Sequence, residues 1–156
     1  MSVTDKRAKF DALLKALNVP AVDLRVGIFS DAGTEPDGQT VAEVATFHEF
    51  GYGVPERSFL RAYLEQEQEK VFDDLTKQLQ SVVDGKRTLK TALNRVGLVV
   101  VAGIKERISN RIEPALDPRT IARKTRADGA TADVPLVHYG QLRNSILHKV
   151  VDSGKE

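Results

Sequence analysis

Cysteine is absent from this 156-residue chain, which excludes disulfide cross-links, thiolate metal sites and cysteine nucleophiles. Excess charge is missing too: 23 Lys and Arg against 22 Asp and Glu leave a formal net charge of +1. No overall field therefore attracts the protein to DNA or to a membrane. The longest apolar run, 96–104, is far shorter than the roughly 20 residues that cross a bilayer. The polar stretch 1–7 lacks the apolar core of a secretory signal, so we expect a soluble protein made where it is used.

The composition that remains is that of an ordinary folded domain. Hydrophobic residues make up 41% of the chain and charged residues 29%, which is typical of globular proteins rather than disordered ones. No internal repeat or low-complexity tract is visible, and the length suits one domain over residues 1–156. We predict an α+β fold in which a small antiparallel sheet packs with a long helix pair, an N-terminal helix and a C-terminal strand.

The first third of the chain predicts one helix and two strands. Thr4 is a suitable N-cap for a helix that ends before residues 18–20. Alternating apolar residues over 22–28 predict a half-buried strand. A second strand is predicted over 40–47, antiparallel to the first across a projecting loop of Gly, Pro, Asp and Ser at 30–39.

The middle of the chain predicts two long helices. Apolar residues recur at spacings of three and four from Phe59 until Asp84-Gly85, which predicts an amphipathic helix. A second helix is predicted from Thr88 to Ile108. Gly97 and Gly103 lower its intrinsic stability by about 1 kcal/mol each relative to Ala, and they let another backbone approach closely.

The last third predicts less regular structure. A short helical turn at 118–122 is expected to open a flexible, basic segment over 118–133. Both helical spacing and alternation fit residues 141–151, and we predict a short helix followed by a strand.

His48-Glu49 is the most tempting catalytic pair in the sequence. A helical zinc hydrolase needs a second histidine four residues after the first, and that position holds Tyr52. On the predicted strand, neighbouring side chains point to opposite faces and cannot share one metal. Gly-x-Ser-x-Gly elbows and phosphate-binding glycine loops are also missing. We therefore expect no enzyme, no metal and no cofactor.

Two charged stretches allow more than one interpretation. The carboxylates between 65 and 74 fit a solvated helix face or an acidic surface for a partner. Four basic residues between 119 and 126 fit either a solvated loop or a weak, non-specific contact with DNA phosphates. No aromatic residue is interleaved with them, so base stacking is not indicated. The candidate DNA-facing residues are Arg119, Arg123, Lys124 and Arg126.

The most informative block is an apolar run over 44–51 that ends in His-Glu-Phe-Gly, followed by Pro-Glu-Arg-Ser-Phe-Leu-Arg over 55–61. A junction of large side chains beside flexible backbone is typical of a surface that grips another protein. We expect Phe59 and Leu60 to lie in the core. The predicted subunit interface consists of Phe47, His48, Glu49, Phe50, Tyr52, Arg57 and Arg61.

This block resembles the neck and tail-completion (virion morphogenesis) proteins of tailed double-stranded DNA phages. The resemblance continues through Thr120 and Lys124 to Pro135-Leu136 and then to the pattern Gly-Gln-Leu-Arg-x-Ser-Ile over 140–146. It covers nearly the whole chain in the correct order. One departure is His138-Tyr139-Gly140, where the family usually has Asp-Thr-Gly.

The resemblance implies a structural virion protein of the head–tail junction: a neck, tail-completion or tail-terminator ring around the DNA passage. Its expected partners are copies of itself, the head connector, tail-tube or sheath proteins, and passing DNA without sequence specificity. It would assemble in the host cytoplasm. Two other classes stay open: a small DNA-binding or regulatory module using 119–126, and a metal-dependent hydrolase using His48 and Glu49.

Overall fold

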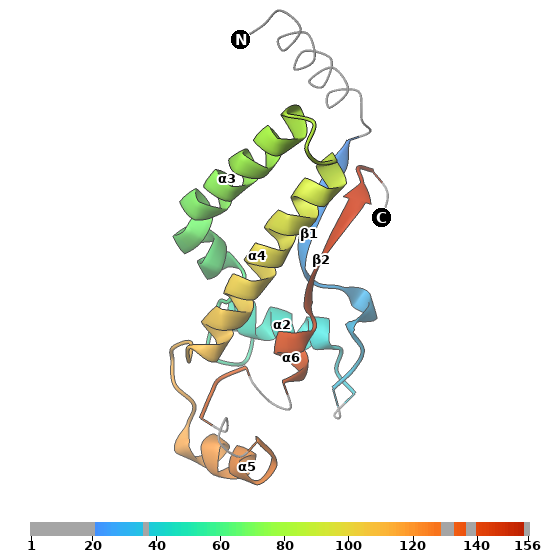
Figure 1. The fold of residues 1–156 in the computed structure, drawn as a ribbon. Coiled ribbons are helices and arrows are strands. Elements are labelled where there is room, and N and C mark those ends of the chain that lie inside the picture. The colour runs from blue at the N-terminus through green and yellow to red at the C-terminus, as the bar shows by residue number, and fades with distance from the viewer. Residues whose placement is uncertain (1–20, 36–37, 129–132, 137–139, 155–156) are drawn as a thin grey trace, which may run out of the picture. The chain divides into compact units, whose positions relative to one another are not determined.

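A computed structural model describes residues 21–35, 38–128, 133–136 and 140–154. The elements follow one another as shown in Figure 1. They are β1 (Val22–Ile28), the 3-10 turn η1 (Ser30–Ala32), α2 (Val41–Phe50), α3 (Arg61–Val83), α4 (Leu89–Ser109), α5 (Pro118–Asp128), α6 (Gln141–Asn144) and β2 (Ile146–Asp152). Strands β1 and β2 pair antiparallel, which confirms the α+β class. The predicted N-terminal helix lies outside the described residues.

The chain divides into two compact units. The first unit comprises residues 1–25, 68–100 and 148–156. The second comprises residues 26–67 and 101–147. Both long helices and both strands contribute residues to each unit. None of the helices in the described ranges is long and apolar enough to cross a bilayer.

The predicted second strand over 40–47 is wrong, because these residues lie in helix α2. Thr40 and Glu43 form a capping box: the Thr40 hydroxyl accepts a 3.2 Å hydrogen bond from the Glu43 N–H, and the Glu43 carboxylate accepts one of 2.9 Å from the Thr40 N–H. Val41 and Ala45, one turn apart, are both buried. The helix ends at Gly51, whose φ of 73° is the left-handed conformation that glycine favours.

The segment between β1 and α2 is therefore not a hairpin loop. After η1, Thr34 and Thr40 form an isolated antiparallel bridge, and the Val41 N–H donates a 3.1 Å hydrogen bond to the Gly33 carbonyl. The described part of 30–39 is tied to the start of α2 by these contacts. The partner of β1 is instead β2, from the far end of the sequence.

The two long helices match their predictions, with α3 spanning 23 residues and α4 spanning 21. The helix glycines accommodate side chains rather than another backbone. In the first unit, Gly97 packs against the His148 ring, and in the second unit Gly103 packs against the Tyr63 ring. A Cβ atom at either glycine would overlap these rings, which explains why glycine occupies helix interiors that disfavour it.

The core of the second unit contains the predicted Phe59, which is 0% exposed, together with Ile104, Ile108 and Ile146. Leu60, also predicted to be core, is only half-buried.

The end of the chain is more ordered than its composition suggests. The described part of 118–133 is mostly helical, since α5 continues to Asp128 instead of ending after one turn. The expected sequence of a short helix and then a strand is confirmed by α6 and β2.

Candidate functional site at the start of helix α3

The Glu49 carboxylate in the last turn of α2 lies at the N-terminus of α3. Its Oε2 atom accepts hydrogen bonds from the backbone N–H groups of Phe59 (2.9 Å) and Leu60 (3.0 Å), and its Oε1 atom accepts one from the Arg61 N–H (2.9 Å). The first N–H groups of a helix have no partner within the helix. The Glu49 carboxylate accepts from the Arg61 N–H and from the two N–H groups just before it, and it faces the positive end of the helix dipole. Glu49 thus fixes where α3 begins.

Ser58 and Arg61 complete the same cluster. The Ser58 hydroxyl donates a 2.7 Å hydrogen bond to Glu49 Oε1 and accepts one of 3.1 Å from the Ala62 N–H. Arg61 donates from Nε to Glu49 Oε1 (3.3 Å) and from Nη2 to the Glu49 carbonyl (2.7 Å) and Glu56 Oε1 (3.0 Å). Hydrogen bonds between side chains at both ends of the α2–α3 connection therefore fix the conformation of that connection.

The charge of Glu49 is maintained by these hydrogen bonds. Burial raises the pKa of Glu49, but donation from Leu60, Arg61, Ser58 and Phe59 outweighs it and holds the pKa below its usual value. The Glu49 side chain is 5% exposed. An ionised carboxylate with every lone pair engaged is a structural anion, with little capacity left to act as a base or to bind a metal.

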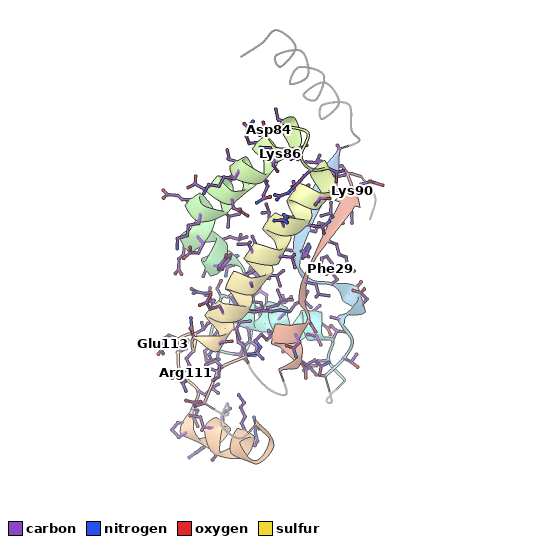
Figure 2. The ribbon with its side chains drawn as sticks, viewed as in Figure 1. Phe29, Asp84, Lys86, Lys90, Arg111 and Glu113 are labelled. Atoms are coloured by element: carbon purple, nitrogen blue, oxygen red, sulfur yellow. The ribbon has the colours of Figure 1, made fainter. Side chains whose placement is uncertain are left out.

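Arg57, which is 5% exposed, ties this region to the chain after α4. Its Nε donates a 2.7 Å hydrogen bond to the Pro114 carbonyl, and its Nη2 donates one of 3.2 Å to the Ala115 carbonyl. Figure 2 shows Arg111 and Glu113 at the end of α4, where this segment begins. The fork of the guanidinium suits two neighbouring carbonyls.

His48 precedes Glu49 on α2, not on a strand, so the argument from opposite strand faces does not hold. Its Nδ1 atom is buried and has no hydrogen-bond partner. Burial, and then the nearby Arg57 charge, lower the pKa of His48, so the ring is neutral near pH 7. Within the described ranges, no three His, Asp or Glu side chains gather as a metal-binding group. The absence of enzymatic activity stays a prediction.

An aromatic patch lies on the outside of the same junction. Phe50 and Tyr52, 46% and 61% exposed, stack with their ring centroids 5.7 Å apart. The Arg61 guanidinium lies 4.6 Å from the Phe50 ring centroid, in cation–π geometry. We call these three residues the Phe50–Tyr52–Arg61 patch. It is pre-organised, because Glu49 and Glu56 hold Arg61 in place.

The predicted interface set thus divides in two. Glu49 and Arg57 are buried and bonded within the chain, whereas Phe50, Tyr52 and Arg61 are exposed. Phe47 and His48 are half-buried. Contact of any of these residues with another subunit stays a prediction.

The predicted DNA-facing residues lie on α5. Arg119 and Arg123 are exposed and four residues apart, so they share one face of the helix. Lys124 is buried, and its Nζ donates a 2.9 Å hydrogen bond to the Val134 carbonyl. Arg126 lies further along the same helix. Lys124 therefore holds the chain after α5 and is not part of an exposed basic face.

A pocket of about 410 Å³ in the second unit was not expected from the sequence. It lies where η1 meets α6 and the start of β2. Its lining consists of Phe29, Asp31, Ala32, Gln141, Asn144, Ser145 and Leu147. The residues that form it come from opposite ends of the sequence, so no local pattern could have indicated it.

Comparison with known proteins found no matching family model, no matching curated protein and no matching solved structure.

Proposed function

We propose that this protein is a structural subunit of the head–tail junction of a tailed phage. Copies of it would form a ring that joins the connector to the tail around the DNA passage, as a neck, tail-completion or tail-terminator component. The proposal rests first on the resemblance of the His-Glu-Phe-Gly and Arg-Ser-Phe-Leu-Arg block to that family.

The observation that carries the proposal is the Phe50–Tyr52–Arg61 patch. Aromatic and arginine side chains dominate the energetics of protein interfaces. Here they are exposed and stacked, and Arg61 is held in place by ion pairs with the buried Glu49 and the exposed Glu56. Little conformational entropy is lost when such a surface docks. In a ring, this patch would meet a different surface on the neighbouring subunit.

The proposal also explains why the block combines two kinds of residue. Glu49 and Arg57 fix the backbone of the junction from within. The large side chains beside them can then present one defined surface to a neighbour. An arrangement of this kind suits assembly, because Glu49 and Arg57, the buried charges at its centre, are both engaged in hydrogen bonds within the chain.

A second candidate is a DNA-binding or regulatory module, favoured by the exposed pair Arg119 and Arg123 on α5. Gel-shift titration at two salt concentrations separates the two functions. A subunit of the head–tail junction is expected to bind DNA weakly, with strong salt dependence and no sequence preference. Tight, sequence-specific binding by the purified protein would support the second candidate instead.

Inactivation of the gene in its phage or prophage tests the proposed function. We expect electron microscopy of induced lysates to show DNA-filled heads and free tails that fail to join, with infectivity restored by the gene supplied in trans. Normal numbers of joined, infectious particles from the inactivated phage would overturn the proposal.

A further inference from the structure

One flank of α3 in the first unit is apolar and exposed. Phe72 and Leu79, which are 62% and 38% exposed, lie seven residues apart on one side of the helix. Glu69, three residues before Phe72, lies on the same side, and Asp73 lies one turn after Glu69. Both carboxylates are exposed. We call these four residues the Phe72 flank. An exposed apolar strip beside charged residues is typical of a surface that contacts another molecule.

The charged residues of the Phe72 flank are both acidic. Among the described residues, neither the Glu69 nor the Asp73 carboxylate takes part in an ion pair or a hydrogen bond. Lys70 and Lys77 are two and five residues from Phe72, which places them roughly 140–160° away around the helix. The flank therefore presents negative charge beside an exposed aromatic ring, and a cationic surface would complement it.

A basic surface of the same length lies on α5 in the second unit. Arg119 and Arg123 are exposed and four residues apart, and the exposed Ala122 lies on the same side of the helix. Within the described ranges, neither guanidinium has an ion-pair or hydrogen-bond partner. Lys124 lies on a different side, where its 2.9 Å hydrogen bond to the Val134 carbonyl holds α5 to its own unit. The arginine side of α5 is thus available to another molecule.

The two surfaces are complementary in charge, spacing and chemistry. The acidic pair on α3 and the basic pair on α5 are each four residues apart, so the charges of each pair lie at the same separation along their helix. A guanidinium donates two parallel hydrogen bonds to a carboxylate, and it also stacks on an aromatic face. The Phe72 flank offers arginine both kinds of contact, because its exposed ring lies beside Glu69 and Asp73.

We propose that the arginine side of α5 in one copy of this chain docks on the Phe72 flank of α3 in a second copy. Arg119 and Arg123 pair with the two carboxylates, while Phe72 and Leu79 supply the apolar area. Exposed ion pairs contribute little free energy each, so the apolar contact provides most of the affinity and the charges select the partner.

The contact joins two different surfaces and is therefore heterologous, the kind that can repeat around a closed ring. It goes beyond the proposed function, because it adds a second surface to the Phe50–Tyr52–Arg61 patch. It also concerns association of the purified protein with itself. Its failure is therefore distinguishable from failure of the gene-inactivation test.

Disulfide trapping between two differently tagged variants tests the contact, because the chain contains no native cysteine. The α3 variant carries Thr76→Cys, at an exposed position one turn after Phe72. The α5 variant carries Ala122→Cys. The control replaces the α3 variant by Leu98→Cys, at an exposed position on α4 in the same unit. After mild oxidation of each mixture, we expect several-fold more mixed dimer from the α3 and α5 variants than from the control. Equal yields would overturn the proposal.

Charge reversal tests the same contact independently of cysteine placement. Adding Glu69→Lys and Asp73→Lys to the α3 variant should lower the yield of mixed dimer to that of the control. Adding Arg119→Glu and Arg123→Glu to the α5 variant as well should restore it, because both surfaces then carry the opposite sign. A yield that is insensitive to the first reversal, or not restored by the second, would contradict the docking.

Binding of DNA by the same arginines is the competing interpretation, and the reversed α5 variant distinguishes the two. Gel-shift titration with duplex DNA is compared for this variant and the wild type. If Arg119 and Arg123 contact a second copy, the reversal removes the mixed dimer and leaves the affinity for DNA within about two-fold. Loss of DNA binding with an unchanged yield of mixed dimer would assign the arginines to DNA and overturn the proposal.

Discussion

Glu49 of α2 accepts a 2.9 Å hydrogen bond from the backbone N–H of Arg61, the first residue of α3. The same carboxylate binds the N–H groups of Phe59 and Leu60. The block over 44–61 therefore has a physical role within the chain, because Glu49 caps the helix that Arg61 begins. The exposed residues of the same block are the ones available to contact a partner protein.

Replacement of Glu49 tests this cap. Glu49→Ala leaves three backbone N–H groups and Arg61 without their acceptor, and we expect it to lower the free energy of unfolding by about 3 kcal/mol. Glu49→Gln keeps the shape and one acceptor oxygen and should cost less. Urea denaturation measures both. The control is Glu56→Gln at a mostly exposed carboxylate, expected within about 0.5 kcal/mol of wild type. Equal losses of stability at the two positions would contradict the claim that Glu49 caps helix α3.

Protonation of the Glu49 carboxylate should contribute to the unfolding of the protein in acid. Because the folded state holds the pKa of Glu49 below its ordinary 4.5, the stabilisation is present above pH 4.5 and is lost as pH falls through the folded pKa. Glu49→Gln should flatten the decrease of stability with falling pH in this range. If stability depended on pH in the variant as strongly as in the wild type, other carboxylates would be responsible for that dependence.

His48 contributes in a different pH range. The folded state lowers the pKa of His48 below 6.5, so the unfolded chain binds a proton more readily. Stability should therefore fall as pH decreases from about 6.5 towards the folded pKa, and this decrease should vanish in His48→Gln. Denaturant titrations between pH 7.5 and 5 provide the measurement. His148→Gln removes a histidine while leaving His48 in place, so it is the matched control and should retain the slope that depends on His48.

Gly103→Ala should destabilise the protein although alanine is the better helix former by about 1 kcal/mol. The added methyl group overlaps the Tyr63 ring, and over-packing of this kind costs about 1–3 kcal/mol. Thermal unfolding measures the loss, and adding Tyr63→Leu to the same variant should restore part of it. A Gly103→Ala protein more stable than wild type would mean that the ring moves aside freely.

Long elements were predictable from the sequence because their period is unambiguous. The apolar repeats that indicate α3 and α4 extend over many turns, and the alternation in β1 is regular. Residues 41–50 form a short apolar run, for which helical and strand patterns look alike. The sequence Thr40-x-x-Glu43, a capping-box pattern, was the signal that could have identified α2, together with Gly51 as its C-terminal stop.

The contacts that define the site were not predictable in the same way. Glu49 caps a helix that begins twelve residues later, whereas capping rules consider only the adjacent residues. In the sequence Lys124 is one of four basic residues between 119 and 126, and only its contact with Val134 explains its burial. The pairing of β1 with β2 joins opposite ends of the sequence, beyond the reach of any local pattern.

The most direct test of the central claim separates folding from assembly. Phe50→Ser with Tyr52→Ser removes the aromatic part of the patch while leaving Glu49 and Arg57 intact. The matched control is Leu98→Ser with Val99→Ser, which removes a similarly exposed apolar pair on α4. Each double variant is supplied in trans to the inactivated phage, and the number of joined heads and tails is counted by electron microscopy. We predict that the patch variant folds with a melting temperature close to wild type yet fails to restore joined particles, whereas the control restores them. Full restoration by the patch variant would contradict the account.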